Sequence, residues 1–291
     1  MRGLILKFAF FVGCTVLSRL PNYEKSARIV AEKLGVELVD MPGSSCCGTT
    51  YMETLDKKTS LALAARNISI AEEMGINIVT VCNGCTENLT KTIMELRGDS
   101  KLREEVNVIL ASTGRKFQGT SEVKHYVRML KEDVGLDKIR SLVKTPFKNI
   151  KVGAHYGCHL LRPSEVMNFE DPNNPKILDD LINVTGAESI DYLNKTECCA
   201  GPVMGIRESV TWSVGLDKVE TIKTQGDVMV TCCPFCYLTF ERCQFMTEKQ
   251  PNLPVIHIPQ LIGLSMGLSP EDVGLSGNKV DSSTVIERRV S

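Results

Sequence analysis

Residues 228–236 read Val-Met-Val-Thr-Cys-Cys-Pro-Phe-Cys, a short strand-like run that ends in a Cys-x-x-Cys turn. The proline of this turn suits the first position of a helix. Residues 77–85, Asn-Ile-Val-Thr-Val-Cys-Asn-Gly-Cys, have the same pattern 151 residues earlier. The chain therefore contains two copies of a strand that leads directly into a cysteine-bearing helix start.

The repeat extends over most of the chain. Each copy consists of one cysteine, a vicinal Cys-Cys pair and a Cys-x-x-Cys turn, and the second copy follows the first at shifts of 144 to 152 residues. This regular spacing indicates an internal duplication. The first copy is Cys14, Cys46, Cys47, Cys82 and Cys85, and the second is Cys158, Cys198, Cys199, Cys233 and Cys236. The other two cysteines, Cys232 and Cys243, fall outside the repeat and are expected to be packing residues or spare thiols.

Hydrophobic periodicity predicts an α/β fold. Two pseudo-repeated Rossmann-like βα halves with parallel sheets are expected. Metal or cluster sites formed by the cysteines would lie at the strand carboxyl ends, where cysteines that are far apart in the sequence can converge. Strands are predicted at 8–12, 36–39, 77–81, 151–155, 188–191, 228–230 and 255–258, and helices at 23–34, 61–74, 177–184 and 208–223.

The predicted domains follow the duplication. Residues 1–145 form the first half, including a polar helical connection at about 101–145, and residues 146–275 form the second half. Residues 276–291 lack periodicity and are predicted to be a mobile tail.

Composition excludes several classes of function. The 291 residues include 34 Lys+Arg and 35 Asp+Glu, so no excess of positive charge points to nucleic acid. The apolar stretch from Gly3 to Leu17 is interrupted by Lys7 and is too short to span a bilayer. It also lacks a signal-peptide cleavage site, so a buried strand and a cytoplasmic location with reduced thiols are predicted.

The cysteine count favours a metal or cluster site in each half. A tetrahedral zinc ion or a cubane cluster takes four cysteines, whereas each half supplies five. The fifth cysteine is either a spectator or a ligand of something larger. Redox-active thiols, strained disulfides within the vicinal pairs and simple packing remain alternatives.

The doubled motif resembles the paired cysteine-rich CCG domains in the B subunit of CoB–CoM heterodisulfide reductase from methanogenic archaea. The likeness runs from about Lys7 to Ser269 and includes His-Tyr-Gly-Cys-His at 155–159. It implies a noncubane [4Fe-4S] cluster on each set of five cysteines, with the disulfide of coenzymes M and B bound between the two clusters. Gly48 matches the CCG glycine, whereas Ala200 follows the second cysteine pair.

The reaction that the resemblance implies needs two electrons and protons. Two clusters flanking the disulfide would each supply one electron. His159, beside Cys158, is the predicted proton donor, with a hydrogen bond to a cluster sulfur as the alternative role. The other three histidines are expected to be structural. The anionic groups of the coenzymes suggest Arg19, Arg162, Lys195 and Arg207 as substrate-binding residues.

The predicted electron donors are other protein chains, because the sequence has no dinucleotide fingerprint and no ferredoxin-type cysteine run. The resemblance implies a ferredoxin-like C subunit with a flavin-containing A subunit behind it, fed by a hydrogenase or a formate dehydrogenase. Two alternatives remain. One is an electron-relay subunit of another CCG-domain oxidoreductase, of the fumarate reductase or lactate/glycolate oxidation type, and the other is a non-catalytic zinc-binding scaffold.

Overall fold

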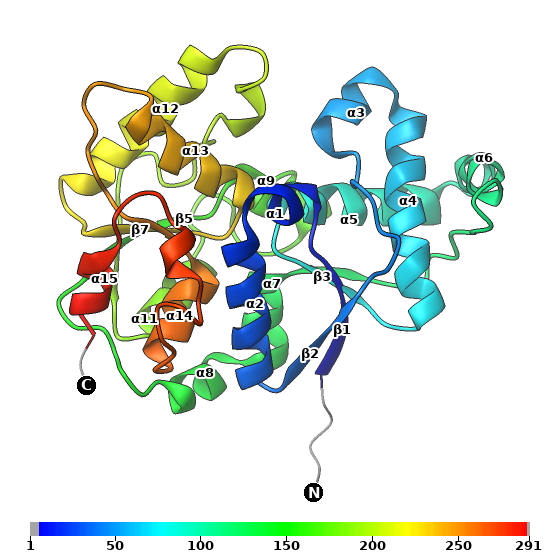
Figure 1. Cartoon of the computed structure of the whole chain (residues 1–291). Coiled ribbons are helices and arrows are strands. Elements are labelled where there is room, and N and C mark those ends of the chain that lie inside the picture. Colours follow the sequence, from blue (N-terminus) through cyan, green and yellow to red (C-terminus); the bar gives the residue numbers. More distant parts are fainter. Residues whose placement is uncertain (1–5, 290–291) are drawn as a thin grey trace, which may run out of the picture.

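The computed structural model describes residues 6–289, and the chain folds as two α/β halves that lie side by side (Figure 1). Each half is built on a four-stranded parallel sheet. The first sheet contains β1 (Leu6–Phe11), β2 (Val36–Asp40), β3 (Ile78–Thr80) and β4 (Val123–His125). The second contains β5 (Lys151–His155), β6 (Glu188–Ile190), β7 (Val228–Thr231) and β8 (Val255–His257).

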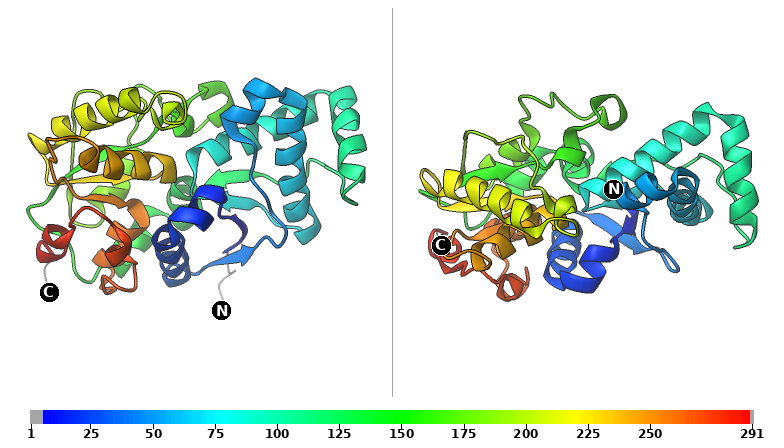
Figure 2. Two further views of the ribbon diagram at one scale, coloured as in Figure 1. Left: turned by 45° about the horizontal axis from the view of Figure 1, so that its top comes forward. Right: turned by 90° about the horizontal axis from the view of Figure 1, so that it is seen from above.

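The helices of the first half connect its strands and extend beyond them. They are α1 (Cys14–Arg19), α2 (Pro21–Lys33), α3 (Thr49–Leu55), α4 (Lys57–Met74), α5 (Asn83–Gly98), α6 (Ser100–Ala111), α7 (Tyr126–Met129), the π-helix η1 (Leu130–Val134) and α8 (Leu136–Leu142). Figure 2 shows α6 at the edge of the molecule that lies farthest from the second half.

The second half has a matching set of helices. They are α9 (Cys158–Leu161), α10 (Ser164–Met167), α11 (Ile177–Asn183), the 3₁₀ helix η2 (Gly201–Val203), α12 (Glu208–Lys223), α13 (Pro234–Phe245), α14 (Ile258–Ser265), the 3₁₀ helix η3 (Leu275–Gly277) and α15 (Ser283–Glu287). Helices α4 and α12 begin at positions related by the 151-residue shift, Lys57 and Glu208.

The strand orders confirm the predicted fold class. They are β2-β1-β3-β4 and β6-β5-β7-β8, so the two sheets have the same topology. In each sheet the chain continues to one side of the first strand and then crosses to the other. Ligands in such sheets bind outside the strand carboxyl ends at that switch point, and the cysteine-bearing segments lie at these ends.

Two segments differ from the sequence-based expectation. The connection at about 101–145 is largely helical, but it also contains β4, which pairs in parallel with β3. Three residues carry too little periodicity to reveal a strand within a helical region. Residues 276–289, expected to be a mobile tail, include α15, and Val280 and Val285 are buried. Their apolar side chains are too widely spaced to produce a recognisable pattern.

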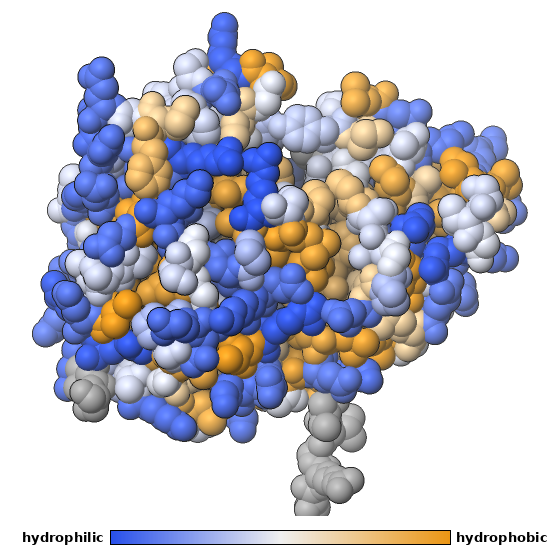
Figure 3. Space-filling model, viewed as in Figure 1, coloured by the Kyte–Doolittle hydropathy of each residue, from blue (hydrophilic) through white to orange (hydrophobic). Residues whose placement is uncertain are grey.

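The two halves share an interface built from the helices beside the sheets. Helix α2 of the first half packs against α14 of the second (Figure 1). Asn22 Nδ2 donates to Asn278 Oδ1 at 3.0 Å, and the buried Ser26 hydroxyl lies 3.2 Å from His257 Nδ1. Figure 3 shows hydrophobic colours gathered around the middle of one face, where the halves meet. This packing brings the carboxyl ends of the two sheets to one shared region.

Gly157 allows the chain to pass close to the cysteines after β5. Its φ is 76° and its ψ is 147°, a conformation that side chains other than glycine rarely adopt. A Cβ atom at this position would lie 2.5 Å from Asn83 Nδ2 and 3.2 Å from Cys236 Sγ. The first-half residue Asn83 therefore packs directly against the turn that presents Cys158.

We expect Gly157→Ala to lower the free energy of unfolding by about 3 kcal/mol, combining about 1 to 3 kcal/mol of backbone strain with about 1 to 3 kcal/mol of overpacking. Gly75→Ala is the matched control, because Gly75 also has a positive φ (67°) but would place its Cβ in open space. Anaerobic urea denaturation measures both. Equal losses in the two variants would contradict the tight packing at Gly157.

Candidate functional site

The first-half cysteines come from three segments at the carboxyl edge of the sheet. Cys14 begins α1, Cys46 and Cys47 precede α3, and Cys82 and Cys85 lie at the start of α5. The Sγ atoms of Cys14 and Cys46 are 3.8 Å apart, and those of Cys47 and Cys85 are 3.4 Å apart. These four cysteines thus form close thiol pairs between segments that are distant in the sequence.

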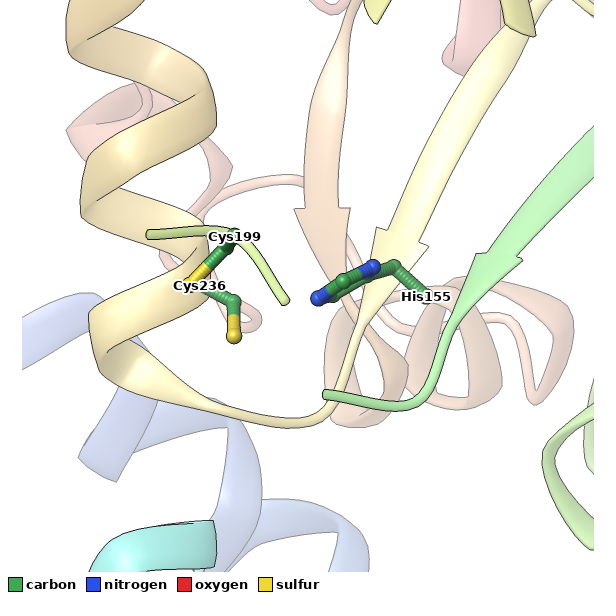
Figure 4. Close-up of side chains that lie close together, drawn as sticks. All are labelled: His155, Cys199 and Cys236. Carbon is green, nitrogen blue, oxygen red and sulfur yellow. The ribbon is translucent and has the colours of Figure 1, made fainter. Parts of the chain in front are cut away.

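The second-half cysteines repeat this arrangement. Cys158 Sγ and Cys198 Sγ are 3.7 Å apart. Cys199 and Cys236 lie near His155, with their sulfurs and one imidazole nitrogen all within 4.8 Å of one another (Figure 4). Cys233 immediately precedes α13, as Cys82 immediately precedes α5. His155 was expected to be structural, and its place beside two predicted ligands was not foreseen.

The thiol geometry fits metal-bound thiolates. Two thiolates on one tetrahedral metal ion with bonds of about 2.3 Å lie about 3.8 Å apart, which agrees with the Cys14–Cys46 and Cys158–Cys198 pairs, whereas the Cys47–Cys85 pair is closer at 3.4 Å. A disulfide requires about 2.05 Å, and all 12 cysteines are free thiols. Five donors in each half exceed the four that one tetrahedral ion accepts. The residues therefore fit an iron–sulfur cluster better than a single zinc ion.

Backbone N–H groups also point at the sulfurs of the vicinal pairs. The Ala200 N–H donates to Cys198 Sγ at 3.2 Å, and the Gly201 N–H donates to Cys199 Sγ at 3.4 Å. The residue after the pair is left-handed, since Ala200 has a φ of 56°. In the first half Gly48 takes this position with a φ of 94°. The alanine thus preserves the backbone shape of the CCG motif.

The close thiols shift one another's pKa values. Hydrogen bonding from Cys158 and Cys199 lowers the pKa of Cys198 to about 2, and the same contact with Cys198 raises the pKa of Cys158. The contact with Cys233 raises the pKa of Cys82 across the boundary between the halves. The two groups of cysteines are therefore electrostatically coupled to each other.

A cleft opens between the two cysteine groups. Both halves contribute to its lining, which includes Thr49, Tyr51, Cys82, Asn83, Cys158, His159, Cys199, Cys233, Phe235 and Cys236. Asn83 Nδ2 donates to the carbonyl of Tyr156 at 2.7 Å, and the Tyr51 hydroxyl donates to the carbonyl of Pro202. These bonds join the halves on both sides of the cleft. A molecule in the cleft would contact cysteines of both groups.

His159 reaches the cleft from the second half and pairs with the first. Its Nδ1 lies 3.6 Å from Oε2 of Glu87, a buried residue of α5. Glu87 raises the pKa of His159, mainly through this contact and against the opposing effect of burial. The imidazole is 28% exposed, so it can exchange protons with solvent. Glu87 was not predicted from the sequence, because nothing in the sequence links it to His159.

The four predicted substrate cations lie in different surroundings. Arg162 donates to the carbonyls of Thr196 and Pro172, and Lys195 pairs with Asp179 at 2.8 Å. Neither residue lines the cleft, and Arg207 is exposed before α12.

Arg19 is the predicted cation that lies beside the cysteines. Together with Cys14, Tyr51 and Phe235 it lines a second hollow, and the two aromatic residues also line the cleft. Arg242 lines the same hollow and was missed, because its sequence context resembles that of any helical arginine.

Glu87→Gln is expected to lower the pKa of His159 toward its ordinary value, because the neighbouring negative charge is lost. A raised pKa means that the pair stabilises the fold below about pH 6.5, and that this contribution is lost as the pH rises through the raised value. NMR titration of the imidazole protons measures the shift, with Glu95→Gln on the same helix as the control. An unchanged titration midpoint in Glu87→Gln would show that the carboxylate does not act on His159.

Comparisons with known proteins agree with the duplicated site. Residues 8–90 and 152–241 each match the family described as the cysteine-rich CCG domain. A Methanosarcina acetivorans protein is 38% identical, aligned over 95% of this chain and 94% of its own length. Its name describes the B subunit of a ferredoxin/F420H2-dependent CoB–CoM heterodisulfide reductase.

Two further relationships are more distant. A Wolinella succinogenes protein, the 8-methylmenaquinol:fumarate reductase membrane anchor subunit, is 32% identical over 95% of this chain and 98% of its own. In the present chain, no helix within residues 6–289 is long and apolar enough to cross a membrane. The structure of a hypothetical protein from Helicobacter pylori has a TM-score of 0.74 at 16% identity, covering 94% of this chain and 52% of its own, and supports the fold alone.

Proposed function

We propose that this chain, which belongs to the cysteine-rich CCG-domain family through both of its halves, reduces the CoM-S-S-CoB heterodisulfide to coenzyme M and coenzyme B. One observation carries the proposal: each half gathers five cysteines at the carboxyl edge of its sheet, and cysteines of both halves, Cys82 from the first and four from the second, line a single cleft between them. The 38% identity to the B subunit of a heterodisulfide reductase supports the choice of substrate.

The ten repeated cysteines would hold the cofactors, one noncubane [4Fe-4S] cluster in each half. The five thiols that each half supplies and the match of both halves to the cysteine-rich CCG domain support this assignment. When bound, the two clusters supply the two electrons that reduction of one disulfide requires. The electrons come from a partner, and we propose a ferredoxin-like C subunit, preceded by a flavin-containing A subunit, as the route in the cytoplasm.

The residues of the chain would hold the disulfide and provide a proton. Tyr51 and Phe235 contribute aromatic side chains to the lining of the cleft. The S–S bond accepts two electrons and two protons and yields two thiols. His159 is placed to donate one of these protons, and Glu87 raises the pKa of its imidazole, which favours the protonated form. Arg19 and Arg242 in the adjoining hollow would attract the anionic groups of the coenzymes.

A second function is an electron-relay subunit of another oxidoreductase. The 32% identity to the Wolinella fumarate reductase protein favours it. In a relay the cysteine sets would carry electrons and the cleft would bind no thiol. The lining of the cleft by cysteines of both halves, together with His159, supports the disulfide-reducing role instead.

Iron and acid-labile sulfide analysis, combined with EPR after coenzyme M is added to the oxidised protein, tests the proposal. We expect about eight iron atoms per chain, four for each cluster, and a signal that depends on the added thiol. Eight iron atoms with no response would favour the relay. Zinc in the protein without acid-labile sulfide would contradict both functions and would favour a structural zinc site.

His159→Asn is expected to lower kcat for heterodisulfide reduction by about 10²- to 10⁴-fold, the usual contribution of a general acid. Iron content and the coenzyme M-dependent EPR signal should stay unchanged, because the variant retains all ten cysteines. Lys138→Ala, at an exposed position on α8, is the surface control. A kcat within twofold of the wild type would remove His159 from proton transfer.

A further inference from the structure

Lys218 is a buried lysine without an acidic partner. It lies on α12 and is 1% exposed. Its ammonium donates to the carbonyl of Glu197 at 2.7 Å and lies 3.4 Å from His155 Nδ1. Among residues 6–289, no carboxylate lies within ion-pairing distance of it. Buried charges are normally paired or placed near a metal site, so this ammonium requires negative charge from another source.

The second-half thiolates are that source. Burial lowers the pKa of Lys218, and the Cys236 and Cys199 thiolates oppose this effect. The loop that carries Glu197 continues directly into Cys198 and Cys199, so the lysine also braces the vicinal cysteine pair. The positive charge is therefore built into the wall of the second-half site.

His155 extends this arrangement to the sulfurs. When Lys218 donates to Nδ1, the neutral imidazole carries its proton on Nε2. Nε2 is buried and has no hydrogen-bond partner among the described residues. Figure 4 shows the end of the ring directed toward the cysteine pair. The Nε2–H group is thus available to the cysteine sulfurs or to what they hold.

The first half lacks both groups at the matching positions. In the repeat, Asn67 corresponds to Lys218 at the 151-residue shift, and Phe11 corresponds to His155 at the 144-residue shift. Asn67 Oδ1 accepts from the Ser45 N–H at 2.8 Å, and Nδ2 donates to the Cys46 carbonyl at 3.3 Å. A neutral amide therefore braces the first cysteine pair in the same place. The halves share their geometry but differ in charge.

We propose that Lys218, acting with His155, raises the reduction potential of the cluster in the second half above that of the cluster in the first half. The inference rests on the proposed function, since it requires a cluster in each half. A nearby cation and an N–H donor both stabilise the more negative, reduced state of a cluster. Lys218 is thus a positioning residue, and the second-half cluster is the first to hold an incoming electron.

An anaerobic redox titration followed by EPR tests this on the cluster-loaded protein. Cys85→Ser and Cys236→Ser assign the signals, because each removes a predicted ligand from one half. Lys218→Met keeps the length of the side chain and removes its charge. We expect at least a tenfold change in the oxidised-to-reduced ratio of the second cluster at fixed potential, a fall of about 59 mV for one electron. The first cluster should not change.

Lys218→Arg and Lys223→Met are the matched controls. The arginine keeps the charge and should keep the potential, and Lys223 lies on the same helix but donates to the Pro251 carbonyl instead. Loss of the second cluster in Lys218→Met with retention in Lys218→Arg also supports the proposal. Loss in both, or unchanged potentials in Lys218→Met, overturns it. A wild-type protein without iron and sulfide would overturn the proposed function as well.

Discussion

The structure depends on bringing five thiol groups together at the carboxyl edge of each sheet. Sulfurs that lie 3.4 to 3.8 Å apart repel one another once they are ionised, and burial adds a further penalty. Backbone N–H groups offset part of this cost, as at Cys198 and Cys199. An iron–sulfur cluster held by these thiols would offset the rest, because its iron ions would neutralise the thiolates. Cluster binding and folding are therefore expected to be linked.

Duplication supplies the geometry, and local substitutions give each half its own chemistry. The sheets have the same strand order, and Ala200 adopts the left-handed conformation that Gly48 adopts in the first half. Where the halves meet, the matching residues differ. Asn83 bonds across the boundary, whereas the matching second-half position is Pro234, which has no side-chain donor. The cleft is thus bordered by two similar scaffolds with different side chains.

The sequence alone predicted the βα repeat, because strand periodicity and cysteine spacing are local and occur twice. It did not predict β4, because these three residues are recognisable as a strand only from their pairing with β3. It also missed the contacts between elements that are distant in the sequence, including Glu87 with His159 and Lys218 with His155. Sequence proximity was a poor guide for the cations, since Lys195 lies near Cys198 in the chain but pairs with Asp179. Residues that are close in the sequence therefore need not lie in the same site of the folded chain.

The contact between His159 and Glu87 has no counterpart at the matching positions of the other half, because Leu238 matches Glu87. In the first half, Thr15 stands at the position that matches His159, and a threonine hydroxyl neither gains nor loses a proton near neutral pH. The surroundings of Cys14 and Cys158 therefore differ in their capacity to supply a proton. A molecule with two unlike ends that bound between the halves would have one favoured orientation, so the duplicated scaffold would bind it in one direction only.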